Sequence, residues 1–202
     1  MFWDRVAGVY DLFANFYNAG THRVLCKEVA SLVSSDDEVL ECACGTGMLT
    51  RHIAPACKHI IATDFSGKML ERARYKCRDY SNASFEYADI LHLDYPDESF
   101  DKVVAANVIH LLDEPLKALS ELDRICRKGG LIIIPTYMNR EKGDGKTSGF
   151  ATAVGKAGAD FKRQFTFSGY QQFFAEAGYK DASFKMIEGR VPCAVAELSK
   201  RG

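Results

Sequence analysis

The sequence lacks the features that mark several classes of protein. Its 202 residues carry 26 Lys and Arg against 27 Asp and Glu, so the net charge of −1 leaves no basic excess for nucleic acid. No hydrophobic run approaches the roughly 20 residues of a membrane-spanning helix. The opening residues MFWDR include an early acid and begin no apolar signal-peptide core. We therefore expect no nucleic-acid partner, no integral membrane segment and no secretion signal.

Cysteine is present, but its pattern argues against disulfides and metal sites. The seven cysteines are odd in number and scattered along the chain, which indicates free thiols in a reducing, cytoplasmic compartment. Cys42 and Cys44 stand close together, but no second Cys or His pair at zinc spacing completes a site. They are more typical of small apolar residues at the end of a buried strand, and no metal is expected.

The hydrophobic pattern predicts a single α/β domain over residues 1–202. Amphipathic helices are expected at 3–17 and 22–32, within a helical N-terminal cap over 1–35. Seven strands are expected, with helices between most of them, at 38–43, 59–63, 84–88, 100–106, 131–135, 182–187 and 191–198. This order predicts a Rossmann-like, doubly wound, mostly parallel seven-stranded sheet. The short link at 188–190 makes the last strand antiparallel to the one before it.

Local signals predict where several helices begin and end. Ser66 and Ser168 stand where helix N-caps are expected, and Gly178 where a helix should stop. Pro115 marks the start of another helix, which is expected to end at residues 127–130, Arg-Lys-Gly-Gly. Residues 138–160 are polar and glycine-rich, which predicts an insertion or lid within the domain.

The stretch from Val39 to Thr50 predicts a nucleotide pocket. An apolar run reaches Glu41, breaks at Gly45 and Gly47, and resumes as a helix, which is the strand–turn–helix design of open parallel sheets. A dinucleotide fingerprint would place a third glycine at Thr50, and a carboxylate at Glu41 would repel a pyrophosphate. The P-loop is excluded because no Lys-Ser or Lys-Thr follows the glycines. A cationic ligand without phosphates, such as S-adenosyl-L-methionine (SAM), suits the acid.

Acids end three successive predicted strands: Glu41, Asp64 and Asp89. Ligands of open parallel sheets bind at the carboxyl ends of the strands, so these side chains should meet at one edge. Asp64 follows the glycines at close to the interval at which an acid contacts a ribose. Asp89 would accept a hydrogen bond from an adenine amine. A single acid at the end of a strand is ordinarily a solvated carboxylate without a ligand. Three such acids in order after the glycine loop favour a ligand site.

In these motifs and in their order, the chain resembles the class I SAM-dependent methyltransferases over roughly its whole length. The matching segments are ECACGTG at 41–47, TDFSGKML at 63–70, ADI at 88–90, SFDKVV at 99–104, NVIH at 107–110 and RKGG at 127–130. The opening segments VAGVYD at 6–11 and GTHR at 20–23 resemble the ubiquinone/menaquinone-biosynthesis C-methyltransferases and related small-molecule enzymes. The resemblance implies SAM as donor, S-adenosyl-L-homocysteine (SAH) as product and a small-molecule acceptor.

The resemblance also implies residue roles around the donor. Glu41 would hold the ammonium group of SAM, Asp64 its ribose and Asp89 the edge of its adenine. The remaining positions expected at the donor are Tyr10, Ala43, Gly45, Thr46, Gly47, Phe65, Ser66, Met69, Ile90, Asn107 and Val108.

A general base is needed only if the acceptor arrives protonated. His110 is the leading candidate, and its alternative role is that of a histidine anchoring a turn. Tyr10, Tyr17 and His22 could also reach the acceptor if the N-terminal helices fold over the pocket.

Other functions stay open. A non-catalytic SAM-binding partner subunit would keep the donor motifs, and a nicotinamide-dependent oxidoreductase is disfavoured by Glu41 and Thr50. An amino-type DNA or RNA methyltransferase would show Asn/Asp-Pro-Pro-aromatic where this chain has Asn107-Val108-Ile109. The acceptor, the methylated atom and the oligomeric state do not follow from the sequence.

Overall fold

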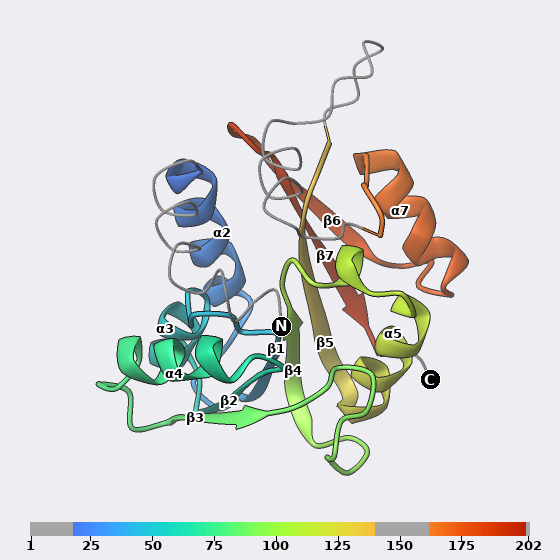
Figure 1. The fold of residues 1–202 in the computed structure, drawn as a ribbon. Coiled ribbons are helices and arrows are strands. Elements are labelled where there is room, and N and C mark those ends of the chain that lie inside the picture. The colour runs from blue at the N-terminus through green and yellow to red at the C-terminus, as the bar shows by residue number, and fades with distance from the viewer. Residues whose placement is uncertain (1–17, 140–161, 201–202) are drawn as a thin grey trace.

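A computed structural model describes residues 18–139 and 162–200. The helix predicted at 3–17, with Tyr10 and Tyr17, and nearly all of the 138–160 segment lie outside these ranges. The described residues form one seven-stranded sheet between two layers of helices (Figure 1). Within these ranges, no helix has the length and apolar character to cross a membrane.

The sheet has the predicted topology. Its strands are β1 Glu38–Cys42, β2 His59–Asp64, β3 Ala83–Tyr87, β4 Phe100–Ala105, β5 Cys126–Tyr137, β6 Ser183–Ile187 and β7 Cys193–Ser199. Their spatial order is β3-β2-β1-β4-β5-β7-β6. The first five strands pair in parallel, whereas β7 lies antiparallel to both neighbours. The strand order reverses between β1 and β4, and this switch point is where such sheets bind ligands.

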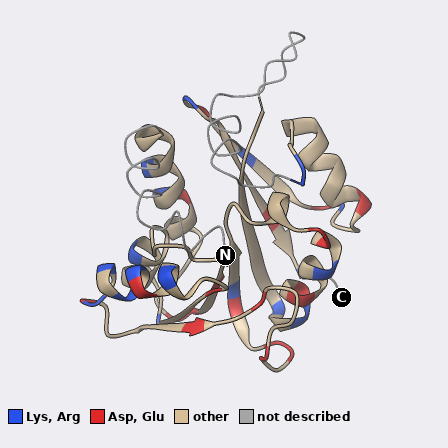
Figure 2. Cartoon of the chain, in the orientation of Figure 1, with Lys and Arg blue, Asp and Glu red and all other residues tan. Residues whose placement is uncertain are grey.

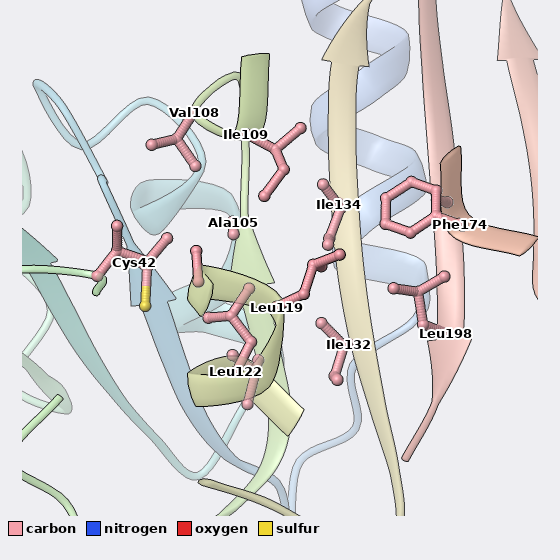
Figure 3. Packing of buried hydrophobic residues seen from close by; sticks show 14 of the residues in the cluster. Cys42, Ala105, Val108, Ile109, Leu119, Leu122, Ile132, Ile134, Phe174 and Leu198 are labelled. Carbon is pink, nitrogen blue, oxygen red and sulfur yellow. The ribbon is translucent and has the colours of Figure 1, made fainter. Parts of the chain in front are cut away.

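Helices cover both faces of the sheet (Figure 1). They are α2 Ala19–Ser31, α3 Thr50–Ile53, α4 Gly67–Lys76, α5 Pro115–Ile125 and α7 Phe167–Glu176, with short 3-10 turns η1 Ala54–Ala56 and η2 Ile109–Leu111. One face packs against α2, α3 and α4, and the other against α5 and α7. Figure 3 shows Leu119 and Leu122 of α5 beside Ile132 and Ile134 of β5, with Phe174 of α7 nearby.

Helix caps were predicted with mixed success. Ser66 accepts a hydrogen bond from the Met69 amide at 3.2 Å, which confirms it as the cap of α4. The predicted cap Ser168 is wrong, because Thr166 caps α7 by accepting from the Gly169 amide at 3.1 Å. Both residues are of capping type, and the helix begins directly after the earlier one.

The helix end expected at residues 127–130 is also wrong. Helix α5 ends at Ile125, and the Arg-Lys-Gly-Gly segment lies within β5 as a bulge. Phe100 pairs with Cys126, but Lys102 pairs with Leu131, so β5 carries extra residues here. Gly129 has φ +77°, which lets the strand kink. A Gly-Gly pair is compatible with a β-bulge as well as with the end of a helix. Which of the two forms depends on the neighbouring strand, here β4.

The bulge gives a stability prediction. A Cβ on Gly130 would lie 2.7 Å from the Asp101 carbonyl oxygen and 2.8 Å from that of Arg127. Because backbone atoms cannot yield cheaply, Gly130→Ala should lower the free energy of unfolding by about 1–3 kcal/mol. Urea denaturation measures this change.

The neighbouring Gly129→Asn variant is the matched control. A Cβ there meets nothing within 4 Å, and Asn tolerates positive φ, so the loss should be a few tenths of a kcal/mol. Equal stability of Gly130→Ala and the unsubstituted protein would contradict the close approach of β4 and β5.

Candidate functional site

A cavity of about 300 Å³ opens at the carboxyl ends of β1, β2, β3 and β4, within the usual range for small-molecule sites. Most residues predicted to hold the donor line it: Glu41, Ala43, Gly45, Thr46, Asp64, Phe65, Met69, Asp89, Ile90, Asn107 and Val108. The fold thus gathers side chains from four strand ends and one helix. Gly47, Ser66 and His110 are not among the lining residues, and Tyr10 lies outside the described ranges.

The loop after β1 has the left-handed backbone that its glycines permit. Gly45 has φ +57° and Gly47 φ +78°, and Ala43 adopts φ +54° without being glycine. A left-handed conformation at a non-glycine residue stores strain, which proteins concentrate at functional sites. A Cβ on Gly47 would lie 3.0 Å from Cys77 Sγ and 3.1 Å from Ala73 Cα. Gly47 therefore lets the loop pack closely on α4.

Asp64, at the end of β2, holds this loop in place. Its Oδ2 accepts from the Gly45 amide and its Oδ1 from the Ser66 amide, both at 2.8 Å. Ionised carboxylates make stronger hydrogen bonds than neutral acceptors do. Each oxygen can accept more than one hydrogen bond, so the carboxylate that shapes the loop can also bind hydroxyl groups in the cavity.

Glu41 is a buried acid on the cavity wall. Its Oε2 accepts from Thr50 Oγ1 at 2.6 Å. Burial raises the pKa of the Glu41 carboxyl to about 8, although the Thr50 hydrogen bond opposes this rise. Thr50 replaces the third glycine of a dinucleotide fingerprint with a hydroxyl that holds the acid. At neutral pH the carboxyl is mostly protonated until a cation approaches it.

The third acid and the aromatic side chains lie at the β3 side. Asp89 Oδ1 accepts from the Leu91 amide at 2.9 Å, which turns the chain after β3. Phe65 is 48% exposed, and its ring lies 5.2 Å from that of Tyr87. Met69, by contrast, is buried against the core. This end offers a flat apolar surface beside a carboxylate acceptor.

His110, the predicted base, is buried in η2. Burial lowers the pKa of its imidazole to about 4, and its carbonyl oxygen accepts from the Arg163 amide at 3.1 Å. These contacts are those of a residue that anchors a turn.

Another histidine, His22 of α2, stands on the cavity wall instead. Its Nε2 contacts the hydroxyl of Tyr137, the last residue of β5. The Tyr137 amide donates to Asn107 Oδ1 at 3.0 Å, which links β5 to the turn after β4. Tyr137 was missed from the sequence, where an aromatic residue after an apolar strand was the only signal.

An acid-rimmed cavity at the switch point of a doubly wound sheet is typical of proteins that bind a nucleoside ligand. Comparison with known proteins agrees with this reading. The "Methyltransferase domain" family matches residues 40–134. A phosphatidylethanolamine N-methyltransferase of Cereibacter sphaeroides is 35% identical over 156 residues, covering 74% of this chain and 71% of that protein.

A further relative and a solved structure widen the comparison. A ubiquinone/menaquinone biosynthesis C-methyltransferase, UbiE, of Bdellovibrio bacteriovorus is 33% identical over 137 residues, or 65% of this chain. The chain spans only 58% of that relative's length. The structure of a DhpI–SAH complex shares the fold with a TM-score of 0.76 at 19% identity, covering 99% of this chain and 95% of that one.

The chain belongs to the class I SAM-dependent methyltransferases. Its methyl donor is SAM and its product is SAH. The predictions of fold, family, enzyme class and cofactor are confirmed.

Proposed function

We propose that the described cavity is the donor site and that the chain transfers the methyl group of SAM to a small molecule with an apolar body. The observation that carries this proposal is the placement of Glu41, Asp64 and Asp89 around one cavity. The residues fit the donor: Glu41 would meet its ammonium group, Asp64 its ribose hydroxyls and Asp89 its adenine amine. Binding of such a ligand gives a physical reason for two costly features of the site, the burial of an acid and the strain in the glycine loop next to it.

SAM supplies a methyl carbon that its sulfonium makes electrophilic. The protein's part is therefore to position the acceptor and exclude water. Carboxylates next to the sulfonium would stabilise a charge that disappears on transfer and would slow the step. The proposed contacts place the three acids on other parts of the donor. Asn107 and Val108, at the end of β4, would lie near the sulfonium.

Several finer assignments belong to the same proposal. The cavity wall formed by His22, Leu25 and Cys26 of α2 supports a role for the 1–35 cap in acceptor choice. The 138–160 insertion is proposed as its counterpart, within one domain over 1–202. Interspersed acids and bases (Figure 2) support an acceptor other than nucleic acid, and seven free, buried cysteines support a cytoplasmic location.

Calorimetry with SAM, SAH and NAD tests the donor assignment. We expect isotherms for both sulfur nucleotides and none for NAD. Transfer of labelled methyl from SAM is then measured with a phosphatidylethanolamine, named by the relative from Cereibacter sphaeroides, and with demethylmenaquinone, named by a relative from Clavibacter sepedonicus. NAD binding without SAM binding would refute the donor assignment. SAM binding without transfer to any of a broad acceptor set would favour the partner-subunit alternative.

A further inference from the structure

The hydroxyl of Thr50 holds the buried side chain of Glu41. Glu41 lies in β1, and Thr50 is the first residue of α3, just beyond the glycine loop. Thr50 Oγ1 donates to Glu41 Oε2 at 2.6 Å, a length typical of a hydroxyl bound to a carboxylate. Thr50 is fully buried and Glu41 is 2% exposed, so solvent does not compete for this contact. The hydrogen bond therefore fixes the position of one carboxyl oxygen.

The other carboxyl oxygen of Glu41 is the one that a ligand can reach. Glu41 lines the cavity, and within residues 18–139 and 162–200 its Oε1 has no hydrogen-bond partner. The side-chain atoms in these ranges that are fully buried without a partner are Nδ1 of His22 and Nδ1 of His110, so Oε1 keeps some exposed surface. Because Thr50 occupies Oε2, Oε1 is the oxygen available to a ligand in the cavity.

The ionisable neighbours of Glu41 give its carboxylate no support. Burial disfavours the charged form, and the charge of Asp64 at the end of β2 disfavours it further. Four thiols nearby are neutral at physiological pH because burial raises their pKa: Cys26, Cys42, Cys44 and Cys77. In the described part of the chain, the Thr50 hydrogen bond is the contact that favours ionisation of Glu41.

We propose that Thr50 is a positioning residue that makes the donor site specific for a ligand with an ammonium group. Its hydroxyl keeps one oxygen of Glu41 toward the cavity and stabilises the negative charge that pairs with the ammonium. Thr50 does not line the cavity, so it acts through Glu41. A nucleoside without an ammonium group gains nothing from this arrangement. The inference rests on the proposed function, because that function assigns the ammonium group of the donor to Glu41.

Calorimetry with SAH and with deamino-SAH, which lacks only the α-amino group, tests the proposal. At pH 7 the parent protein should bind SAH about 30-fold more tightly than deamino-SAH, the effect of one charge-assisted hydrogen bond. In Thr50→Val this preference should fall to about threefold. The affinity for deamino-SAH should stay the same, because Glu41 remains neutral beside that ligand.

Three further variants locate the effect. Thr50→Ser keeps the hydroxyl and should keep the preference. Thr50→Ala should lose the preference without placing a methyl group against the carboxyl, and it replaces Thr50→Val if that variant does not fold. Thr63→Val is the matched control, because Thr63 Oγ1 donates to the backbone carbonyl oxygen of Glu41 at 3.3 Å and not to its side chain. It should keep the preference of the parent protein.

The pH profile separates support of the charge from support of the structure. Loss of the Thr50 hydrogen bond should raise the pKa of Glu41 above its value of about 8. Higher pH ionises the carboxyl without help from Thr50. The roughly tenfold deficit of Thr50→Val at pH 7 should therefore shrink to about threefold at pH 8.5. A side chain that is merely displaced would show the same deficit at both pH values.

Each contrary result overturns the assignment of Thr50. These results are a preference that survives in both Thr50→Val and Thr50→Ala, a preference that is lost equally in Thr50→Ser, and a deficit that does not change with pH. Equal binding of SAH and deamino-SAH by the parent protein would overturn it as well. Failure of the parent protein to bind SAH at all would instead refute the proposed function, so the two failures are distinguishable.

Discussion

Asp64→Ala is expected to weaken SAM binding by about 2–4 kcal/mol, which is roughly 30- to 1,000-fold in Kd. Two ribose hydroxyls donating to one carboxylate are charge-assisted hydrogen bonds, each worth about 1.5–3 kcal/mol before water compensates. The structure adds a second cause, because the Gly45 and Ser66 amides lose their shared acceptor. Calorimetry with SAM measures the total loss, and circular dichroism checks that the variant is folded.

Two controls separate the ribose contact from the support of the loop. Asp64→Asn keeps one acceptor oxygen and should lose about half as much free energy of binding. The parent protein should distinguish SAH from its 2′,3′-dideoxy form, whereas Asp64→Ala should bind the two nearly alike. If the alanine variant still discriminates between them, the ribose lies elsewhere and Asp64 supports only the loop.

Glu41 should make the protein less stable as the pH rises from 6.5 to 8. Its pKa is about 8 in the folded protein and about 4.5 in the unfolded chain, so the unfolded chain binds fewer protons in this range. The stabilising contribution of the neutral carboxyl is complete below pH 4.5 and is lost as the pH rises through 8. The expected fall in unfolding free energy between pH 6.5 and 8 is about 2 kcal/mol.

The buried histidines act in the opposite direction at lower pH. The pKa values of His22 and His110 are lowered to about 4, so both must be neutral in the folded protein. The stabilising contribution of these neutral imidazoles to the free energy of unfolding is complete above about pH 6.5 and is lost as the pH falls toward 4. Stability should therefore peak near pH 6.5 and fall on both sides.

Glu41→Gln should separate stability from donor binding. The amide is nearly isosteric with a protonated carboxyl and cannot ionise, so the fall between pH 6.5 and 8 should disappear. The same variant should bind SAM more weakly, because the donor's ammonium loses its counter-charge. In the parent protein, SAM binding below pH 8 should release a proton, which calorimetry in buffers of different ionisation enthalpy detects. Unaltered SAM affinity in Glu41→Gln would place the ammonium elsewhere.

The sheet could be predicted because its determinants are local. Each strand is a short apolar run bounded by turn residues, and the three acids follow strands whose carboxyl ends must meet. Features that depend on a distant partner could not be predicted. The bulge at residues 127–130 exists because Gly130 faces the Asp101 carbonyl of β4, and neither glycine signals that neighbour.

Dependence on a distant partner also explains why some residues do not lie in the site as the sequence predicted. His110 follows β4 by a few residues, but η2 turns it into the core, whereas α2 brings His22 to the cavity from far away in the chain. Gly47 belongs to the glycine loop, but its lack of a side chain matters because α4 packs closely against it. Chain order predicts which residues share a sheet edge, and packing decides which of them face the cavity.

The position of β7 between β5 and β6 has a consequence for synthesis of the protein on the ribosome. Residues 193–199 are translated last of the seven strands, yet they pair with β5 on one side and β6 on the other. Until they emerge, the nascent chain holds β5 with an open edge and β6 without its neighbour. Exposed strand edges recruit other chains. A chain whose synthesis stops before residue 193 would therefore be prone to aggregation, although every residue of the proposed donor site had already been translated.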